Sequence, residues 1–145
     1  MVYCGHGTGE AYFRGDHIER VPRCAAALLF GCSSGHLAEQ GALDPDGHVL
    51  SYLVGGSPAV AANLWDVTDH DLDRMSAALM AGVGLLAEPL PAALAPYAPL
   101  ASLPPRPTIA EALVRARGAC RMPYLVGAAM VVYGIPVLAA AAEDD

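Results

Sequence analysis

Residues 24–35 read CAAALLFGCSSG, and this stretch decides which fold the chain can adopt. Its first seven residues are apolar without interruption, and the run ends at Gly31. A short continuous apolar run that ends in a glycine turn is typical of a strand buried on both faces, as in a parallel sheet covered by helices. The stretch therefore predicts an α/β fold in which Cys32 follows the carboxyl end of a buried strand.

The rest of the chain alternates between strand and helix patterns. Thr68 with Asp71, and Thr108 with Glu111, have the spacing of a capping box, so each pair predicts the first turn of a helix. Strands that alternate with helices indicate a mainly parallel sheet with crossover connections. We expect strands at 1–4, 24–30, 58–65 and 131–134, helices at 33–40 and 49–56 and from Thr68 and Thr108 onward, an edge strand at 11–13 and a turn at 44–48.

The composition narrows the class of protein. A chain of 145 residues is long enough for one domain with its own core. The net charge of −7 argues against a nucleic-acid surface, and the apolar runs are far shorter than the roughly 20 residues of a membrane span. The four cysteines form no C-x-x-C pair, so we expect free thiols in a reducing, intracellular compartment. Five histidines and four cysteines without the paired spacing of zinc sites predict no metal.

Three predicted strand ends carry residues suited to chemistry. His6 lies in YCGHGTG after the first strand, Cys32 follows the second, and Trp65 and Asp66 follow the strand at 58–65. The carboxyl ends of parallel strands meet at one edge of a sheet, where sites of this fold class lie. We therefore expect the three loops to converge.

Cys32 has two interpretations. As a nucleophile it needs a base, for which His6 is suitable, and N–H donors for an oxyanion, which Gly7 and Cys32 itself can supply from the backbone. As a structural residue it is simply a small buried side chain at a turn, since free cysteine is often buried. The pattern alone leaves both interpretations open.

Four aspartates crowd the segment LWDVTDHDLDR. Asp69 and Asp71 suit the first turn of a helix, where the helix dipole favours anions. Asp73 and Asp66 have no such explanation, and a carboxylate directed into a pocket holds a basic side chain well. Trp65 is either an apolar wall for the stem of that side chain or a residue of the core.

Taken together, these motifs resemble separase, the caspase-like cysteine endopeptidase that opens cohesin at anaphase. The resemblance covers most of the chain, and LWDVTD followed by D-x-D-R is its most specific part. The matching stretches are YCGHGTGE at 3–10, AAALLFGCSSGHLAEQG at 25–41, SPAVAANLWDVTDHDLDR at 57–74 and YLVGAAMVVYGIPV at 124–137.

The resemblance implies roles for particular residues. His6 matches the catalytic histidine and Cys32 the nucleophile, with the N–H groups of Gly7 and Cys32 as oxyanion donors. Cleavage follows arginine in this family, and the acidic pocket matches the segment in which Asp73 is the first choice, followed by Asp66 with Trp65 beside it. The implied substrate is the kleisin subunit of cohesin, the implied inhibitor is securin, and no cofactor is needed. These roles belong to cell division, in the cytoplasm and nucleus, with no direct contact to nucleic acid or membrane.

The resemblance also implies a fold and its extent. A caspase-like three-layer α/β/α arrangement with a mainly parallel sheet is expected. The family's protease domain begins earlier than this chain, so we expect residues 1–145 to be a partial, N-terminally incomplete peptidase domain. Seven prolines between 89 and 107 indicate an insertion. Two alternatives remain, namely another caspase-like peptidase of the CHAT type, or a non-catalytic fragment that only binds peptides.

Overall fold

The computed structural model describes residues 1–86 and 107–138, which fall into two compact units. The first unit comprises Met1–Val67 and Ala129–Ile135, and the second comprises the described residues between Thr68 and Ala128 together with those from Pro136 onward. The insertion predicted at about 89–107 lies outside the described residues apart from Pro107.

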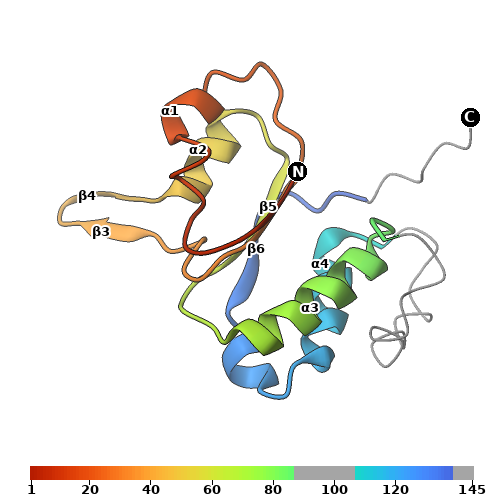
Figure 1. The fold of residues 1–145 in the computed structure, drawn as a ribbon. Helices are drawn as coiled ribbons and strands as arrows, with labels where there is room; N and C mark the ends of the chain where they lie inside the picture. The colour runs from red at the N-terminus through yellow and green to blue at the C-terminus, as the bar shows by residue number, and fades with distance from the viewer. Residues whose placement is uncertain (87–106, 139–145) are drawn as a thin grey trace, which may run out of the picture. The chain divides into compact units, whose positions relative to one another are not determined.

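The first unit is built on a four-stranded sheet, in which β1, β2 and β5 run parallel and β6 runs antiparallel to β5. Its order is β1 (Val2–Cys4), β2 (Ala27–Phe30), β5 (Ala59–Asn63) and β6 (Met130–Gly134). Figure 1 shows β5 beside β6. Every residue of β2 and β5 is buried, as their continuous apolar sequences require. The four predicted strands in these regions are confirmed, and the carboxyl ends of the three parallel strands share one edge.

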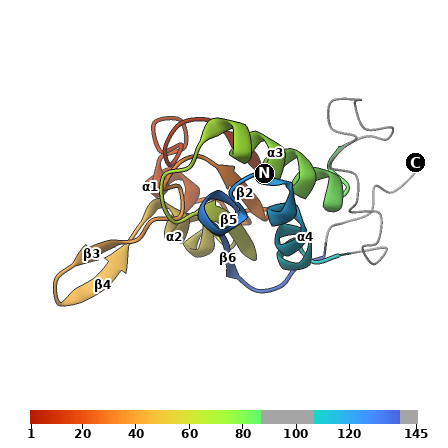
Figure 2. The same ribbon diagram turned by 90° about the horizontal axis from the view of Figure 1, so that it is seen from below.

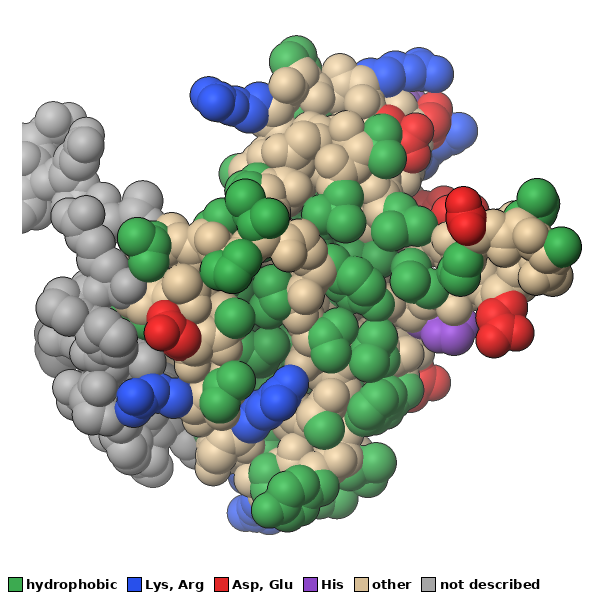
Figure 3. Space-filling model, turned by 180° about the vertical axis from the view of Figure 1, so that it is seen from behind, with side chains coloured by type: hydrophobic (Ala, Val, Ile, Leu, Met, Phe, Trp, Pro, Cys, Tyr) green, Lys and Arg blue, Asp and Glu red, His purple; other side chains and the backbone are tan. Residues whose placement is uncertain are grey.

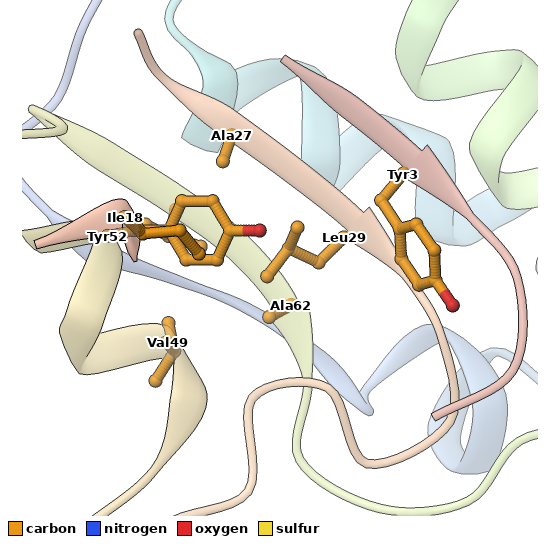
Figure 4. Close-up of a cluster of buried hydrophobic side chains, with 8 residues drawn as sticks. Tyr3, Ile18, Ala27, Leu29, Val49, Tyr52 and Ala62 are labelled. Carbon is orange, nitrogen blue, oxygen red and sulfur yellow. The ribbon is translucent and has the colours of Figure 1, made fainter. Parts of the chain in front are cut away.

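One face of this sheet carries the hydrophobic core of the first unit. Tyr3, Leu29 and Ala62 come from three adjacent strands and point to the same side of the sheet (Figure 4). Two short helices cover them, α1 (Gly15–Ile18) and α2 (His48–Val54), which contribute Ile18, Val49 and Tyr52. Each large apolar side chain that is fully buried in this way contributes about 1.5–3 kcal/mol. The helix predicted at 49–56 is thereby confirmed, and it ends before Gly55 and Gly56.

His48 and Tyr52 place polar atoms inside this core. Their rings meet edge to face with centroids 5.4 Å apart, and among the described residues neither the His48 Nε2 nor the Tyr52 hydroxyl has a hydrogen-bond partner. Burial lowers the pKa of His48 below its ordinary 6.5, although the negative charge of Glu10 acts in the opposite direction. Burial also raises the pKa of Tyr52 to about 12.

A hairpin replaces the helix predicted at 33–40 and the turn predicted at 44–48. Strand β3 (Ala38–Gln40) pairs with β4 (Leu43–Asp46), and Gly41, with φ of 64°, makes the turn between them. The hairpin extends away from the sheet, and its side chains are exposed, with apolar and acidic groups at its surface (Figures 2 and 3). The predictions were wrong because an exposed hairpin has no buried face, so it leaves no periodic apolar pattern.

The edge strand predicted at 11–13 is also wrong. The N–H groups of Tyr12 and Phe13 both donate to the carbonyl of Gly9, at 2.9 and 3.0 Å, so the chain makes a turn there. Gly9 has φ of 78°, a conformation that glycine adopts readily.

The second unit is helical. Helices α3 (Asp69–Gly82) and α4 (Ile109–Ala116) pack against each other, followed by the short turns η2 (Arg117–Ala119) and η3 (Pro123–Gly127) (Figure 1). Buried side chains of this unit include Leu72, Met75, Leu79, Ile109 and Leu113. Within the described part of the chain, none of the helices is long and apolar enough to cross a membrane.

The two predicted capping boxes differ in outcome. The box of Thr108 and Glu111 forms as expected, with reciprocal hydrogen bonds at the start of α4. Thr68 does precede α3, but its side chain makes no capping bond. The buried carboxylate of Asp71 instead accepts from the N–H groups of Arg121 and Met122, at 3.0 and 2.9 Å, and from Arg74 at 2.9 Å.

Asp71 therefore tethers the segment after α4 to α3. Its burial by itself favours the neutral acid, but the hydrogen bonds from Arg121, Met122 and Arg74 outweigh this and lower the pKa of the carboxyl. The interpretation of Asp71 as an ordinary helix-start acid is thus incomplete, because its bonds extend to residues 50 and 51 positions away.

The buried ring of His48 predicts that this chain loses stability in mild acid. Below pH 6.5 the unfolded state takes up a proton at this histidine more readily than the folded state, so the free energy of unfolding falls as the pH falls. Urea unfolding between about pH 7.5 and about pH 5.5 tests this expectation, and His48→Gln should flatten part of the slope. Val54→Ala, at an exposed and non-titrating position of the same helix, is the control and should leave the slope unchanged. Identical slopes for the wild type and His48→Gln would contradict the prediction.

Candidate active site

The histidine loop, residues 5–9, follows directly from the end of β1. The Tyr3 hydroxyl donates to the carbonyl of His6 at 2.8 Å, which anchors the loop to the strand. Gly5 makes room for this bond, since a Cβ there would lie 2.6 Å from the Tyr3 hydroxyl oxygen. Gly7 has φ of 64°, so the chain turns sharply after His6. The imidazole of His6 is exposed.

The cysteine loop, residues 31–35, follows from the end of β2. The thiol of Cys32 is half-buried and donates to the carbonyl of Val67 at 3.4 Å. Ser33 has φ of 53°, and it is the one described non-glycine residue with positive φ. Such a conformation is unfavourable for a serine and persists only where neighbours enforce it. Here the Ser33 N–H donates to the carbonyl of Trp65 at 3.2 Å, and the Ser33 hydroxyl donates to Asp66 at 2.6 Å.

The two loops touch through backbone. A Cβ on Gly31 would overlap the carbonyl oxygen of Gly7 and would lie 3.2 Å from that of Gly5. The approach is possible only because Gly31 has no side chain. The structure thus brings the loops that carry His6 and Cys32 together at the shared edge of β1 and β2.

Two backbone donors at this contact are available. Across residues 1–86 and 107–138, the N–H groups of Gly7 and Cys32 have no hydrogen-bond acceptor. Unpaired N–H groups on adjoining glycine-rich turns are suited to an oxyanion, because they require no rearrangement when negative charge develops.

Asn63, at the carboxyl end of β5, forms hydrogen bonds with the cysteine loop. The Ser34 hydroxyl donates to the carbonyl of Leu29 at 2.9 Å and accepts from the N–H of Asn63 at 3.1 Å. The Asn63 side-chain amide donates to the carbonyl of Gly31 at 3.0 Å, and the Gly35 N–H donates to the carbonyl of Asn63 at 2.7 Å. Asn63 is not among the site residues predicted from the sequence. Its signal is a polar residue that ends the otherwise apolar run AVAAN.

The predicted pocket residues are distributed over both units. Trp65 and Asp66 lie in the first unit, where their backbone and side chain hold Ser33. Trp65 is 39% exposed, which does not fit the alternative of a core residue. Asp73 is an exposed residue of α3 in the second unit, and its backbone carbonyl accepts from the Ser76 hydroxyl at 2.9 Å.

The thiols of the chain differ in environment. Burial raises the pKa of Cys120 to about 11, with the charge of Asp71 acting in the same direction, so this thiol stays protonated at neutral pH. Cys32, by contrast, is half-buried in a glycine turn beside the histidine loop. Among the described residues no group of three or more histidine, cysteine or acidic side chains is arranged to hold a metal ion.

The contact between the loops predicts a strong effect of Gly31→Ala. The added methyl group meets the Gly7 backbone, which cannot rotate away as a side chain would, so we expect a loss of about 1–3 kcal/mol in the free energy of unfolding. The rate of Cys32 alkylation by iodoacetamide should change as well, because the loops separate. Gly118→Ala is the control, since nothing lies within 4 Å of a Cβ there. Equal unfolding midpoints for the two variants would contradict the proposed contact.

The chain is similar in sequence to known proteins of one family. Residues 1–72 match the family model described as "Separin, protease domain". The chain is 43% identical over 137 residues to separin of Emericella nidulans, and 43% identical over 136 residues to separin of Mus musculus. Each alignment covers 94% of this chain but only 6% of the relative's length. The chain thus spans a small part of the curated relatives that it matches.

Solved structures agree with the sequence comparison. The separase chain of a Saccharomyces cerevisiae separase–securin complex, determined at 2.6 Å, superposes with a TM-score of 0.77 at 39% identity, over 94% of this chain and 8% of that one. The 3.0 Å structure of the same complex gives a TM-score of 0.76 at 37% identity. The predicted caspase-like α/β fold with a mainly parallel sheet is confirmed by this agreement and by the observed sheet. By sequence and by fold, the chain is similar to separins in the region of their protease domain.

Proposed function

We propose that this chain carries the catalytic centre of a cysteine endopeptidase, with Cys32 as nucleophile and His6 as base. The observation that carries the proposal is the backbone contact between Gly31 and Gly7, which holds the cysteine loop against the histidine loop. The matches to separin protease domains support the same reaction class.

The arrangement of these loops supports the following reaction. His6 accepts the proton of the Cys32 thiol, and the thiolate attacks the substrate carbonyl carbon. The N–H groups of Gly7 and Cys32 donate to the oxygen on which negative charge develops. His6 then gives its proton to the leaving amine, the C–N bond breaks, and a thioester remains on Cys32. Water attacks the thioester and releases the acid, which restores the thiol.

The substrate is part of the proposal. We place arginine before the cleaved bond, with the exposed carboxylate of Asp73 as the first-choice partner of its guanidinium. One oxygen of Asp66, the second choice, already accepts from Ser33, which favours Asp73.

The natural substrate is the kleisin subunit of cohesin, cleaved in the cytoplasm or nucleus at chromosome separation. Securin is the proposed inhibitor, and the structurally similar yeast separase, which was crystallised in complex with securin, supports securin as a partner.

Covalent labelling tests the nucleophile. An arginyl acyloxymethyl ketone probe should label the full-length protein at Cys32, and Cys32→Ser should abolish labelling because the hydroxyl is a far weaker nucleophile. Cys24→Ser is the control, since that thiol donates to the Ile18 carbonyl at 3.8 Å and has no part in the reaction. Labelling that survives Cys32→Ser, or is lost in Cys24→Ser, would overturn the assignment. Peptide binding without turnover would favour a non-catalytic module.

The specificity for arginyl peptides tests the proposed role of Asp73. Asp73→Asn should lower kcat/KM for arginyl peptides at least about 30-fold, because it removes the charge that pairs with the guanidinium. The control is Asp69→Asn, which changes an exposed acid in the first turn of the same helix. Similar kcat/KM values for both variants would exclude Asp73 as the partner of arginine.

A further inference from the structure

Asn63 is the last residue of β5, and it binds the cysteine loop on both sides of Cys32. Its side-chain amide donates to Gly31, which precedes Cys32, and its backbone N–H and carbonyl bond to Ser34 and Gly35, which follow it. Asn63 is 0% exposed, so it reaches no substrate or solvent. These bonds connect Asn63 directly to the loop that carries Cys32.

The bond to Gly31 acts on one particular peptide unit. The carbonyl of Gly31 and the N–H of Cys32 belong to the same peptide, which is planar and trans, so the two groups point in opposite directions. The Asn63 amide holds that carbonyl at 3.0 Å. It therefore sets the direction of the Cys32 N–H, one of the two unpaired donors at the loop contact.

The side-chain amide of Asn63 is satisfied on one side only. The Asn63 Oδ1 is buried and has no hydrogen-bond partner among the described residues. An unsatisfied buried acceptor is costly, so the bond that the amide nitrogen makes is the favourable part of this side chain's burial. The acceptor of that bond lies in the cysteine loop.

We propose that Asn63 is a positioning residue that orients the Cys32 N–H as an oxyanion donor. The inference rests on the function proposed above. A hydrogen bond to the carbonyl of a peptide also polarises that peptide and strengthens its N–H as a donor. The N–H engages the substrate oxygen most strongly in the transition state, so the effect falls on kcat rather than on KM.

Two reactions of Cys32 separate this role from a general structural one. Hydrolysis of an arginyl peptide needs the oxyanion donors, whereas alkylation of the thiol by iodoacetamide forms no oxyanion. In the full-length protein, Asn63→Ala should lower kcat about 10- to 100-fold, while KM stays within about twofold. The alkylation rate of Cys32, followed by mass spectrometry of its peptide, should also stay within about twofold.

The pH dependence of kcat in a second variant tests the same hydrogen bond. In Asn63→Asp, the neutral carboxyl group can donate to Gly31 as the amide does, whereas the carboxylate cannot. The ratio of its kcat to that of the wild type should therefore rise as the pH falls from about 8 to about 6, since burial raises the pKa of such a carboxyl into this range. This variant also keeps the volume of the side chain if Asn63→Ala does not fold.

Ser57→Ala is the matched control. Ser57 is a buried polar residue near the opposite end of β5, and its hydroxyl donates to the carbonyls of Ala25 and Ala59 at 2.9 and 3.0 Å. Its loss should lower the unfolding midpoint as a buried hydrogen bond does, with kcat unchanged.

The outcomes distinguish a failure of the proposed function from a failure of the positioning role of Asn63. Turnover that persists in Cys32→Ala contradicts the proposed function, and so does a wild type without turnover. If turnover depends on Cys32 but Asn63→Ala leaves kcat within about twofold, only the positioning role fails. A parallel fall of hydrolysis and alkylation in Asn63→Ala, or a flat pH ratio for Asn63→Asp, also overturns it.

Discussion

The absence of a side chain at Gly31 is the constraint on which the rest of the site depends. The neighbouring strands β1 and β2 run parallel and end at the same edge of the sheet. The histidine loop and the cysteine loop therefore begin side by side. Because Gly31 lies directly against the carbonyl of Gly7, the loops stay in contact instead of diverging. A methyl group would be enough to push the histidine loop away from the cysteine loop.

Buried polar side chains at element ends hold irregular backbone in both units. In the first unit, Asn63 and Ser34 satisfy backbone groups of the cysteine loop. In the second, Asp71 satisfies the N–H groups of Arg121 and Met122. Backbone that leaves a strand or helix while still buried needs such partners, because an unpaired buried N–H or carbonyl is costly.

Predictions from sequence were correct where burial leaves a pattern and wrong where it does not. Strands β2 and β5 were recognisable because both faces are buried, which makes their sequences continuously apolar. The exposed hairpin of β3 and β4 was missed, since its pairing depends on the turn at Gly41 and on no apolar face. The role of Asn63 was missed too, because a lone polar residue at a strand end does not reveal which backbone group it meets.

The sequence by itself determined the class of fold and the order in which His6, Cys32 and Asp66 follow the ends of successive parallel strands. Apolar runs and glycine turns are local properties, so they can be read without coordinates. Only the tertiary structure decided that the loops of His6 and Cys32 touch and that Asp66 accepts a hydrogen bond from Ser33. It also decided that the Asn63 amide donates to the carbonyl of the Gly31–Cys32 peptide. Those contacts join residues about 25 to 35 positions apart, and their geometry depends on strand register and on the space that a missing side chain leaves.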